Sequence, residues 1–203
     1  MVFIASVAAL NTNFPQLPAG KVEGDTINEM DPYYFSEENH PYAQAKSMAN
    51  RVVDQFIAGN PDPGFEITTV SPVGVIGMAM STREDSTSMG LQFLIKNKIA
   101  PSPFIQMLYD LDVNWALVDV ADVGESVYRA ATRKNLHGKN YLITSESYRI
   151  SDISLMLNGK DPVGQPSSVY SNALATRELG VKFKPASVPL EQYAKATMVS
   201  AKA

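Results

Sequence analysis

The 203-residue sequence contains no cysteine, two histidines and a single tryptophan. The lack of cysteine excludes disulfides, thiolate metal sites and cysteine nucleophiles. His40 and His137 lie far apart in sequence, and no His-x-x-x-His pattern or acidic ligand cluster accompanies them. We therefore expect no metal centre, and we expect a reducing, cytoplasmic location.

An excess of positive charge is also missing. Lys and Arg total 17 against 21 Asp and Glu, so the net charge of −4 offers no basic surface for nucleic acid or an anionic membrane. Every hydrophobic run breaks within about ten residues, well short of the 18 or so that a membrane-spanning helix needs. The apolar start has no basic residue before Lys21, so it lacks the cationic start of a signal peptide. With 45% hydrophobic and 19% charged residues, the chain should fold as one domain.

The first part of the chain predicts a strand, a long loop and a strong helix. The continuous apolar run Val2–Ala8 is typical of a central strand in a parallel sheet with both faces covered. Residues 11–40 have no regular period and predict a long loop, either a functional segment or a floppy insertion. Pro41 opens a helix that should run to about Ala58, with Asn39 or His40 as its cap. One stripe of that helix is apolar and should pack against a sheet: Ala45, Met48, Ala49, Val52 and Phe56.

The rest of the chain alternates between strand and helix patterns. The run that begins at Glu66 predicts a strand that stops near Val70, followed by a turn at Pro72 and Gly74. The other expected elements are short helices between Met78 and Leu111, strands at Trp115–Val120 and Tyr141–Thr144, a helix capped by Asp119 or Asp122, and helices from Asp152, Asn172 and Leu190. This alternation indicates an α/β fold.

Tyr42 and Lys46 are four residues apart on the strong helix, so their side chains leave the same face one turn from each other. An ammonium beside a phenol favours the phenolate, which suits acid/base catalysis. Such a pair is a frequent chance match, and an ordinary helix-flank pair is the alternative interpretation. Specificity comes from the context, which is Ser6 at the end of the first apolar strand and a Pro/Gly turn after the helix.

Several segments in order resemble the extended short-chain dehydrogenase/reductases, in particular dihydroflavonol-reductase-like and NAD-dependent epimerase/dehydratase members. VFIASVAAL resembles the family's strand that ends in the catalytic serine, and PYAQAK resembles its Tyr-x-x-x-Lys helix. SPVGVIG is similar to the Asn-Pro-x-x-Val-x-Gly-Pro turn, and LVDVADVGESVYRAA to the Val-Asp-Val-x-Asp-Val-Ala segment. YLITSESYRISDI and LGVKFKPASVPLEQ resemble the family's C-terminal region.

The resemblance implies roles for individual residues. Tyr42 would exchange a proton with the substrate oxygen, Ser6 would hold that oxygen, and Lys46 would bind the nicotinamide ribose and assist Tyr42. The cofactor, NADP or NAD, would contact Tyr42 and Lys46 and the turn formed by Pro72, Val73, Gly74 and Val75. Two departures from the pattern affect the nicotinamide side, because Ser71 stands in place of the usual Asn and Met78 in place of the usual Pro.

The family's glycine-rich turn is absent. The sequence holds no Gly-x-Gly-x-x-Gly and no Gly-x-x-Gly-x-x-Gly. The nearest match, Gly74-x-x-Gly77, has Met80 at the position of the third glycine. The resemblance therefore implies the C-terminal part of such an enzyme: a partial Rossmann-like, doubly wound parallel sheet with a small, mostly helical substrate-binding subdomain. Residues 1–203 would form a single incomplete domain, with 78–115 and 150–203 on the substrate side. The chain would be a fragment, a mis-started gene product or a functional remnant.

The expected function is that of an NAD(P)-dependent oxidoreductase acting on a carbonyl or alcohol of a small organic substrate, inactive or weak as this chain alone. A non-catalytic binding or regulatory remnant and a sugar-nucleotide epimerase or dehydratase are the alternatives. A strand exposed at residue 2 would favour association, for example as a homodimer. A group of apolar residues would form either a substrate pocket or plain core: Met78, Met80, Met89, Phe93, Phe104 and Met107.

Overall fold

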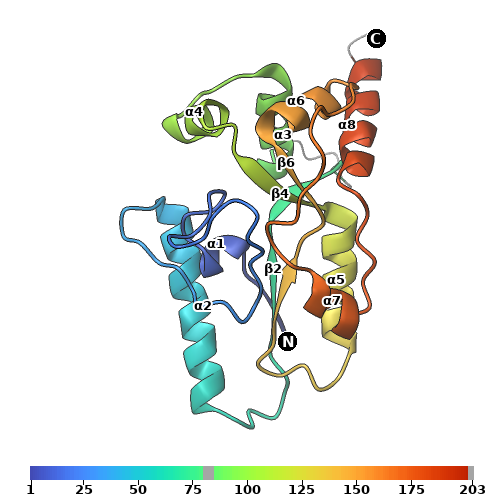
Figure 1. Cartoon of the computed structure of the whole chain (residues 1–203). Coiled ribbons are helices and arrows are strands. Elements are labelled where there is room, and N and C mark those ends of the chain that lie inside the picture. The colour runs from blue at the N-terminus through green and yellow to red at the C-terminus, as the bar shows by residue number, and fades with distance from the viewer. Residues whose placement is uncertain (80–84, 201–203) are drawn as a thin grey trace.

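The computed structural model describes residues 1–79 and 85–200, and it confirms an α/β fold built on two three-stranded sheets (Figure 1). The first sheet is parallel and has the order β1 (Val2–Ile4), β2 (Thr68–Pro72), β5 (Asn140–Ile143). The second has the order β3 (Gly74–Ile76), β4 (Asn114–Asp119), β6 (Ser147–Arg149). Strand β3 runs parallel to β4, whereas β6 runs antiparallel to it and was not expected from the sequence.

The first strand is shorter than predicted. Strand β1 ends at Ile4, and the apolar residues that follow form the buried helix α1 (Val7–Leu10). The reason is local: extended Ser6 accepts a hydrogen bond from the Ala8 N–H at 3.2 Å and so caps a helix. The expectation of a central strand is also wrong, because within the described residues β1 pairs only with β2, and Ile4 is 52% exposed.

The expected turn at Pro72 is absent, since the chain passes almost straight from β2 into β3. Along β2 the N–H groups alternate: Thr68 donates towards the β1 side, and Val73 donates to the carbonyl of Ile143 beside β5. Pro72 therefore directs its nitrogen to the β1 side, where β1 has already ended, and its missing N–H leaves no unpaired partner. One continuous segment thus links the two sheets.

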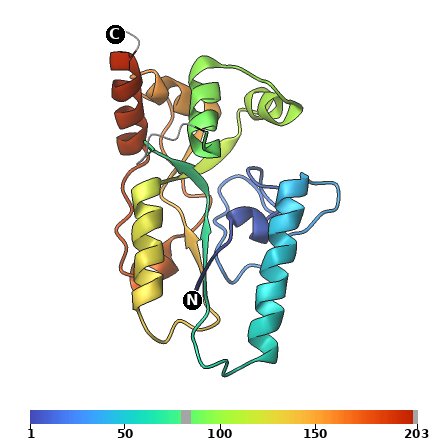
Figure 2. The same cartoon turned by 180° about the vertical axis from the view of Figure 1, so that it is seen from behind.

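Helices surround both sheets. They are α2 (Pro41–Gly59), α3 (Thr87–Asn97), α4 (Pro103–Asp110), α5 (Val120–Thr132), α6 (Ile150–Leu157), α7 (Ala173–Glu178) and α8 (Ser187–Ser200). Both views show α2 and α5 on opposite sides of the first sheet, with α3, α4, α6 and α8 gathered around the second (Figures 1 and 2). Among the described residues, no helix combines the length and apolar character needed to cross a bilayer.

Residues 11–40 contain no helix or strand, as predicted, yet they are held to the body of the protein. Single β-bridges join Asn11 to Tyr34 and Ile27 to Tyr170. The side-chain amide of Asn11 also donates to the Tyr170 hydroxyl at 2.9 Å, and Ile27 is buried. The segment is therefore packed rather than a floppy insertion.

Helix α2 has the predicted extent but the opposite orientation. Its apolar stripe faces outward, with Val52 64% exposed and Met48 and Phe56 exposed as well. Its buried residues are small or polar, namely Ala43, Ser47 and Asn50, and α2 packs against α1. Small side chains allow that close approach, whereas Met48 and Phe56 would hold the helices apart.

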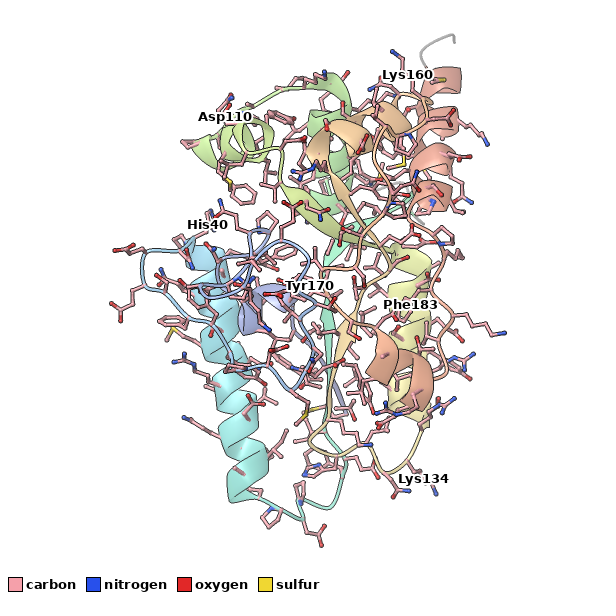
Figure 3. All side chains as sticks on the ribbon, viewed as in Figure 1. His40, Asp110, Lys134, Lys160, Tyr170 and Phe183 are labelled. Atoms are coloured by element: carbon pink, nitrogen blue, oxygen red, sulfur yellow. The ribbon has the colours of Figure 1, made fainter. Side chains whose placement is uncertain are left out.

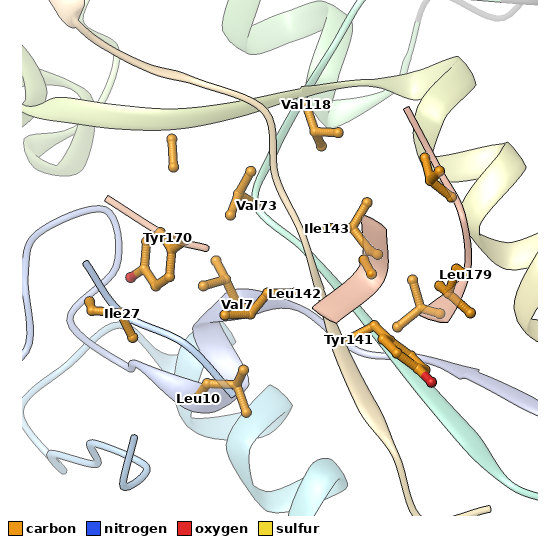
Figure 4. Packing of buried hydrophobic residues seen from close by; sticks show 14 of the residues in the cluster. Val7, Leu10, Ile27, Val73, Val118, Tyr141, Leu142, Ile143, Tyr170 and Leu179 are labelled. Carbon is orange, nitrogen blue, oxygen red and sulfur yellow. The ribbon is translucent and has the colours of Figure 1, made fainter. Parts of the chain in front are cut away.

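The buried hydrophobic residues form two clusters. The first surrounds the parallel sheet and includes Val7, Val73, Leu142 and Tyr170 (Figure 4). The second lies between β4 and helices α3, α4, α6 and α8. Of the apolar residues whose role was open, Met89, Phe104 and Met107 pack partly buried against the second cluster, Phe93 and Met78 are exposed, and Met80 lies outside the described residues.

Candidate active site

A cleft of about 510 Å³ lies between the first sheet and the helices of the second. Ser6 follows the carboxyl end of β1 and Val73 follows that of β2, and both line the cleft. Ligands of open α/β sheets bind beyond the carboxyl ends of the strands. The cleft therefore lies where this architecture places a binding site.

Ser6 is held in place by its role as the cap of α1. Its Oγ accepts the Ala8 N–H, which fixes the oxygen at the helix start. A serine hydroxyl has one proton and two lone pairs, so this bond leaves the proton free to donate. Ser6 can thus offer a hydrogen bond to an oxygen in the cleft.

Tyr42 is the second residue of α2 and lines the same cleft. The helix begins there because Pro41 suits a first helical position and His40 Nδ1 accepts the Tyr42 N–H at 3.2 Å. Tyr42 is 56% exposed, and Lys46 Nζ lies 5.9 Å from the centre of its ring. Within residues 1–79 and 85–200, neither the Tyr42 hydroxyl nor the Lys46 ammonium has a hydrogen-bond partner. The Tyr42 hydroxyl is available to a ligand in the cleft, whereas Lys46 lies outside the lining of the cleft.

The segment after β2 contributes Val73, Gly74 and Val75 to the cleft wall, while Pro72 lies just outside the lining. Gln92 of α3 fixes the end of this segment, because its amide accepts the Gly77 N–H at 3.1 Å and donates to the Gly77 carbonyl at 3.0 Å. Gly77 has φ of 115°, a conformation that favours glycine. No sequence signal pointed to Gln92.

The structure thus brings most of the expected site residues together. Ser6, Tyr42, Val73, Gly74 and Val75 face one cleft, and Lys46 stands one turn along α2 beside Tyr42. Many of the other lining residues were not proposed as site residues from the sequence, among them Phe14, Trp115 and His40, which is labelled at the start of α2 in Figure 3. Of these residues, only His40 could have been suspected from the sequence, because it stands two residues before Tyr42.

The junction of β4 and α5 is fixed by Lys184 from the C-terminal tail. Its ammonium lies 2.6 Å from Asp119 and 3.4 Å from Asp122, and the hydrogen bond with Asp119 raises the pKa of Lys184. Asp119 also accepts the Ala121 N–H at 3.0 Å, so it caps α5 as predicted. These two aspartates have structural roles.

Three solved structures resemble the chain over nearly its whole length. The yeast methylglyoxal/isovaleraldehyde reductase Gre2 complexed with NADPH is 21% identical, with a TM-score of 0.75 over 99% of this chain and 64% of that one. Gre2 from Candida albicans in complex with NADPH is 18% identical, with a TM-score of 0.72 over 96% of this chain and 64% of that one. RMD from Pseudomonas aeruginosa complexed with NADPH is 18% identical, with a TM-score of 0.63 over 96% of this chain and 64% of that one.

The chain has the fold of these Rossmann-like reductases. It spans about two thirds of the length of each of them. No family model matches the sequence, and no curated protein is similar to it. The resemblance noted from short sequence segments therefore agrees with the fold, and the roles of Ser6, Tyr42 and Lys46 stay predictions.

Proposed function

We propose that this chain carries the substrate side of an NAD(P)-dependent oxidoreductase of the extended short-chain type. The reaction is the reduction of a carbonyl, or oxidation of an alcohol, on a small organic molecule. One observation carries the proposal: Ser6 and Tyr42 line the same apolar-walled cleft at the carboxyl ends of parallel strands, and the Lys46 ammonium lies 5.9 Å from the centre of the Tyr42 ring.

In the proposed mechanism, Tyr42 donates its phenolic proton to the carbonyl oxygen as that oxygen gains negative charge. Ser6 donates a hydrogen bond to the same oxygen and fixes its position. Lys46 stabilises the phenolate that Tyr42 becomes. Proton transfer from a positioned group of this kind is typically worth about 10²–10⁴ in rate.

The cleft fits the reactive end of a nicotinamide cofactor, which would supply the hydride. Val73, Gly74 and Val75 offer a mostly apolar wall for a flat ring. Lys46 does not line the cleft, so contact between its ammonium and a ribose hydroxyl is part of the proposal and rests on its position beside Tyr42. The rest of the dinucleotide needs a glycine-rich turn at a helix start, and the sequence has none. We therefore expect weak cofactor binding by these 203 residues. NADP(H) is the first cofactor to test, because the structural neighbours named above were solved with NADPH.

The test compares NADPH and NADH, each at millimolar concentration, as reductants of a small ketone by the purified chain. The variant Tyr42→Phe removes the proton donor, and Tyr128→Phe removes an exposed hydroxyl from α5 as the control. We expect slow reduction that falls at least about 100-fold in Tyr42→Phe and is unchanged in Tyr128→Phe. Equal rates in Tyr42→Phe and the original chain would refute the assigned role.

A non-catalytic binding protein is the second candidate, and the position of Lys46 outside the lining of the cleft favours it. In that case the cleft binds small carbonyl ligands, and no hydride transfer occurs with either cofactor at any concentration. The apolar wall of the cleft gives no support to a sugar nucleotide, so epimerase or dehydratase activity is the weaker alternative.

We also propose that the chain forms a homodimer through the exposed stripe of α2. Two antiparallel copies of α2, crossing between residues 50 and 51, place Ala45 opposite Phe56 and Ala49 opposite Val52. Each small residue then faces a large one, which is the arrangement that packed helices favour. A second copy would remove the exposed apolar surface from water.

A further inference from the structure

The only tryptophan of the chain has an unpaired hydrogen-bond donor at the cleft. Trp115 is 6% exposed, lines the cleft, and packs edge-on against Phe14 with ring centres 6.5 Å apart. Its indole Nε1 is buried and has no hydrogen-bond partner among the residues that the structure describes. A buried donor without an acceptor is costly and uncommon in native structures, so its presence needs a reason.

Gly74 makes room for this donor. A β-carbon at Gly74 would stand 2.6 Å from Trp115 Nε1, which is closer than unbonded atoms approach. The backbone of Gly74 is not in the left-handed region, so its conformation alone does not call for glycine. The missing side chain therefore serves the indole, and it leaves Nε1 beside a residue that itself lines the cleft.

Three other polar residues of the cleft already have roles. Ser6 and Tyr42 carry the hydroxyls assigned to the reacting oxygen, and both ends of the Gln92 amide bind Gly77. The surroundings of Trp115 are apolar, with Leu117 on the same strand and Ile153 from α6. In apolar surroundings a hydrogen bond to a ligand is strengthened, because water does not compete for the donor.

We propose that Trp115 is a specificity-determining residue whose indole N–H donates to a second acceptor oxygen of the substrate, away from the reacting carbonyl. The cleft then prefers a carbonyl compound that carries such an acceptor over one of the same skeleton without it. This inference rests on the proposed function for the identity of the reacting oxygen. The binding preference itself needs no hydride transfer.

The experiment uses two probes that differ by one carbonyl oxygen, 1-phenylpropane-1,2-dione and 1-phenylpropan-2-one. Because the chain has one tryptophan, its indole N–H gives a single, unambiguous NMR signal. We expect the dione to shift this signal and to bind about tenfold more tightly than the monoketone, the contribution of one hydrogen bond. Trp115→Phe keeps an aromatic wall and removes the donor, so this preference should disappear. The control Phe104→Leu trims the wall without changing a donor and should keep the preference.

An indole signal that neither probe moves would overturn the inference, as would an unchanged preference in Trp115→Phe or a lack of binding at millimolar concentrations. If circular dichroism shows Trp115→Phe unfolded, the indole shift in the original chain decides alone. A failure of the proposed reductase activity looks different, because the dione preference would persist while neither NADPH nor NADH supports reduction.

Discussion

The two helices that flank the parallel sheet use their faces in opposite ways. Helix α5 directs Val123, Val127 and Ala130 into the first hydrophobic cluster and exposes Tyr128. Helix α2 buries Ala43, Ser47 and Asn50 and exposes the apolar stripe that contains Val52. An apolar stripe therefore shows that a helix has a contact to make, but not that the contact lies within the same chain.

The buried polar groups of the two helices also differ, because those of α5 and α2 are not equally hydrogen-bonded. Ser126 of α5 is fully buried, and its hydroxyl donates to the Asp122 carbonyl at 2.7 Å. Under α2, the Ser47 hydroxyl and the Asn50 amide oxygen are buried without a hydrogen-bond partner in the described part of the chain. Within the described residues, the buried Ser126 hydroxyl of α5 is thus satisfied, whereas two buried polar atoms of α2 are not.

The largest effect is expected where α5 meets the sheet. Ala130→Asp places a carboxylate at a position that is 5% exposed and surrounded by apolar side chains. Burial of an unpaired charge should lower the free energy of unfolding by about 3 kcal/mol or more, measured by urea denaturation. The neighbouring Ala131→Asp is the control, because Ala131 is exposed and should tolerate the change. Similar losses in both variants would contradict the comparison.

On α2 the matching change should affect association rather than folding. Val52→Glu puts a charge in the middle of the exposed stripe, where the proposed homodimer would bury it against its own copy. We expect the dimer dissociation constant, measured by analytical ultracentrifugation, to rise at least about tenfold while the unfolding free energy stays unchanged. Ala58→Glu lies outside the stripe and serves as the control. A monomeric original chain would remove the homodimer proposal.

On the α5 side of the first sheet, helix α7 ends in a charged residue, Glu178, whose contribution to stability should depend on pH (Figure 1). Glu178 accepts hydrogen bonds from Lys139 at 2.6 Å and from the Tyr141 hydroxyl at 2.8 Å, and these lower the pKa of Glu178 to about 2 from an ordinary 4.5. Because the folded pKa is the lower one, the stabilisation is complete above pH 4.5 and is lost as the pH falls towards 2.

Glu178→Gln tests this contribution. We expect the original chain to exceed the variant by about 1–2 kcal/mol of unfolding free energy at pH 7, after allowance for solvent screening, with the gap closing in acid. The control Glu191→Gln changes an exposed carboxylate that pairs with Lys195 at 3.5 Å and should show little effect at either pH. A gap that persists unchanged at pH 2.5 would assign the loss to packing rather than to charge.

The sequence predicted elements better than it predicted contacts. Helix α2, strand β4 and the Asp119 cap of α5 follow from local patterns, since capping residues and hydrophobic periods act within a few positions. Strand β6 was missed because three residues carry too little pattern. The outward stripe of α2 was assigned to the core because periodicity shows that a face is apolar and says nothing of what covers it.

The residues of the candidate site were likewise predicted only in part. Ser6 and Tyr42 were found through a resemblance of short segments, and the structure places both at one cleft. Gln92, which clamps Gly77, and Trp115, which rests on Gly74, were not found as site residues. Their roles arise from packing between segments that are distant in sequence, and no spacing rule encodes such contacts.

The smallest expected effect comes from removing one buried serine hydroxyl from each helix, and it compares α2 and α5 most directly. Ser47→Ala on α2 removes a buried hydroxyl that has no partner and adds a better helix former, so we expect a gain of about 0.5–1 kcal/mol in unfolding free energy. Ser126→Ala on α5 makes the same chemical change but removes a hydroxyl that binds the Asp122 carbonyl, so its gain should be smaller or become a loss. Urea denaturation of both variants at pH 7 gives the difference. An equal response would mean that the hydroxyl of Ser47 is already satisfied, and α2 would then fit this chain as completely as α5 does.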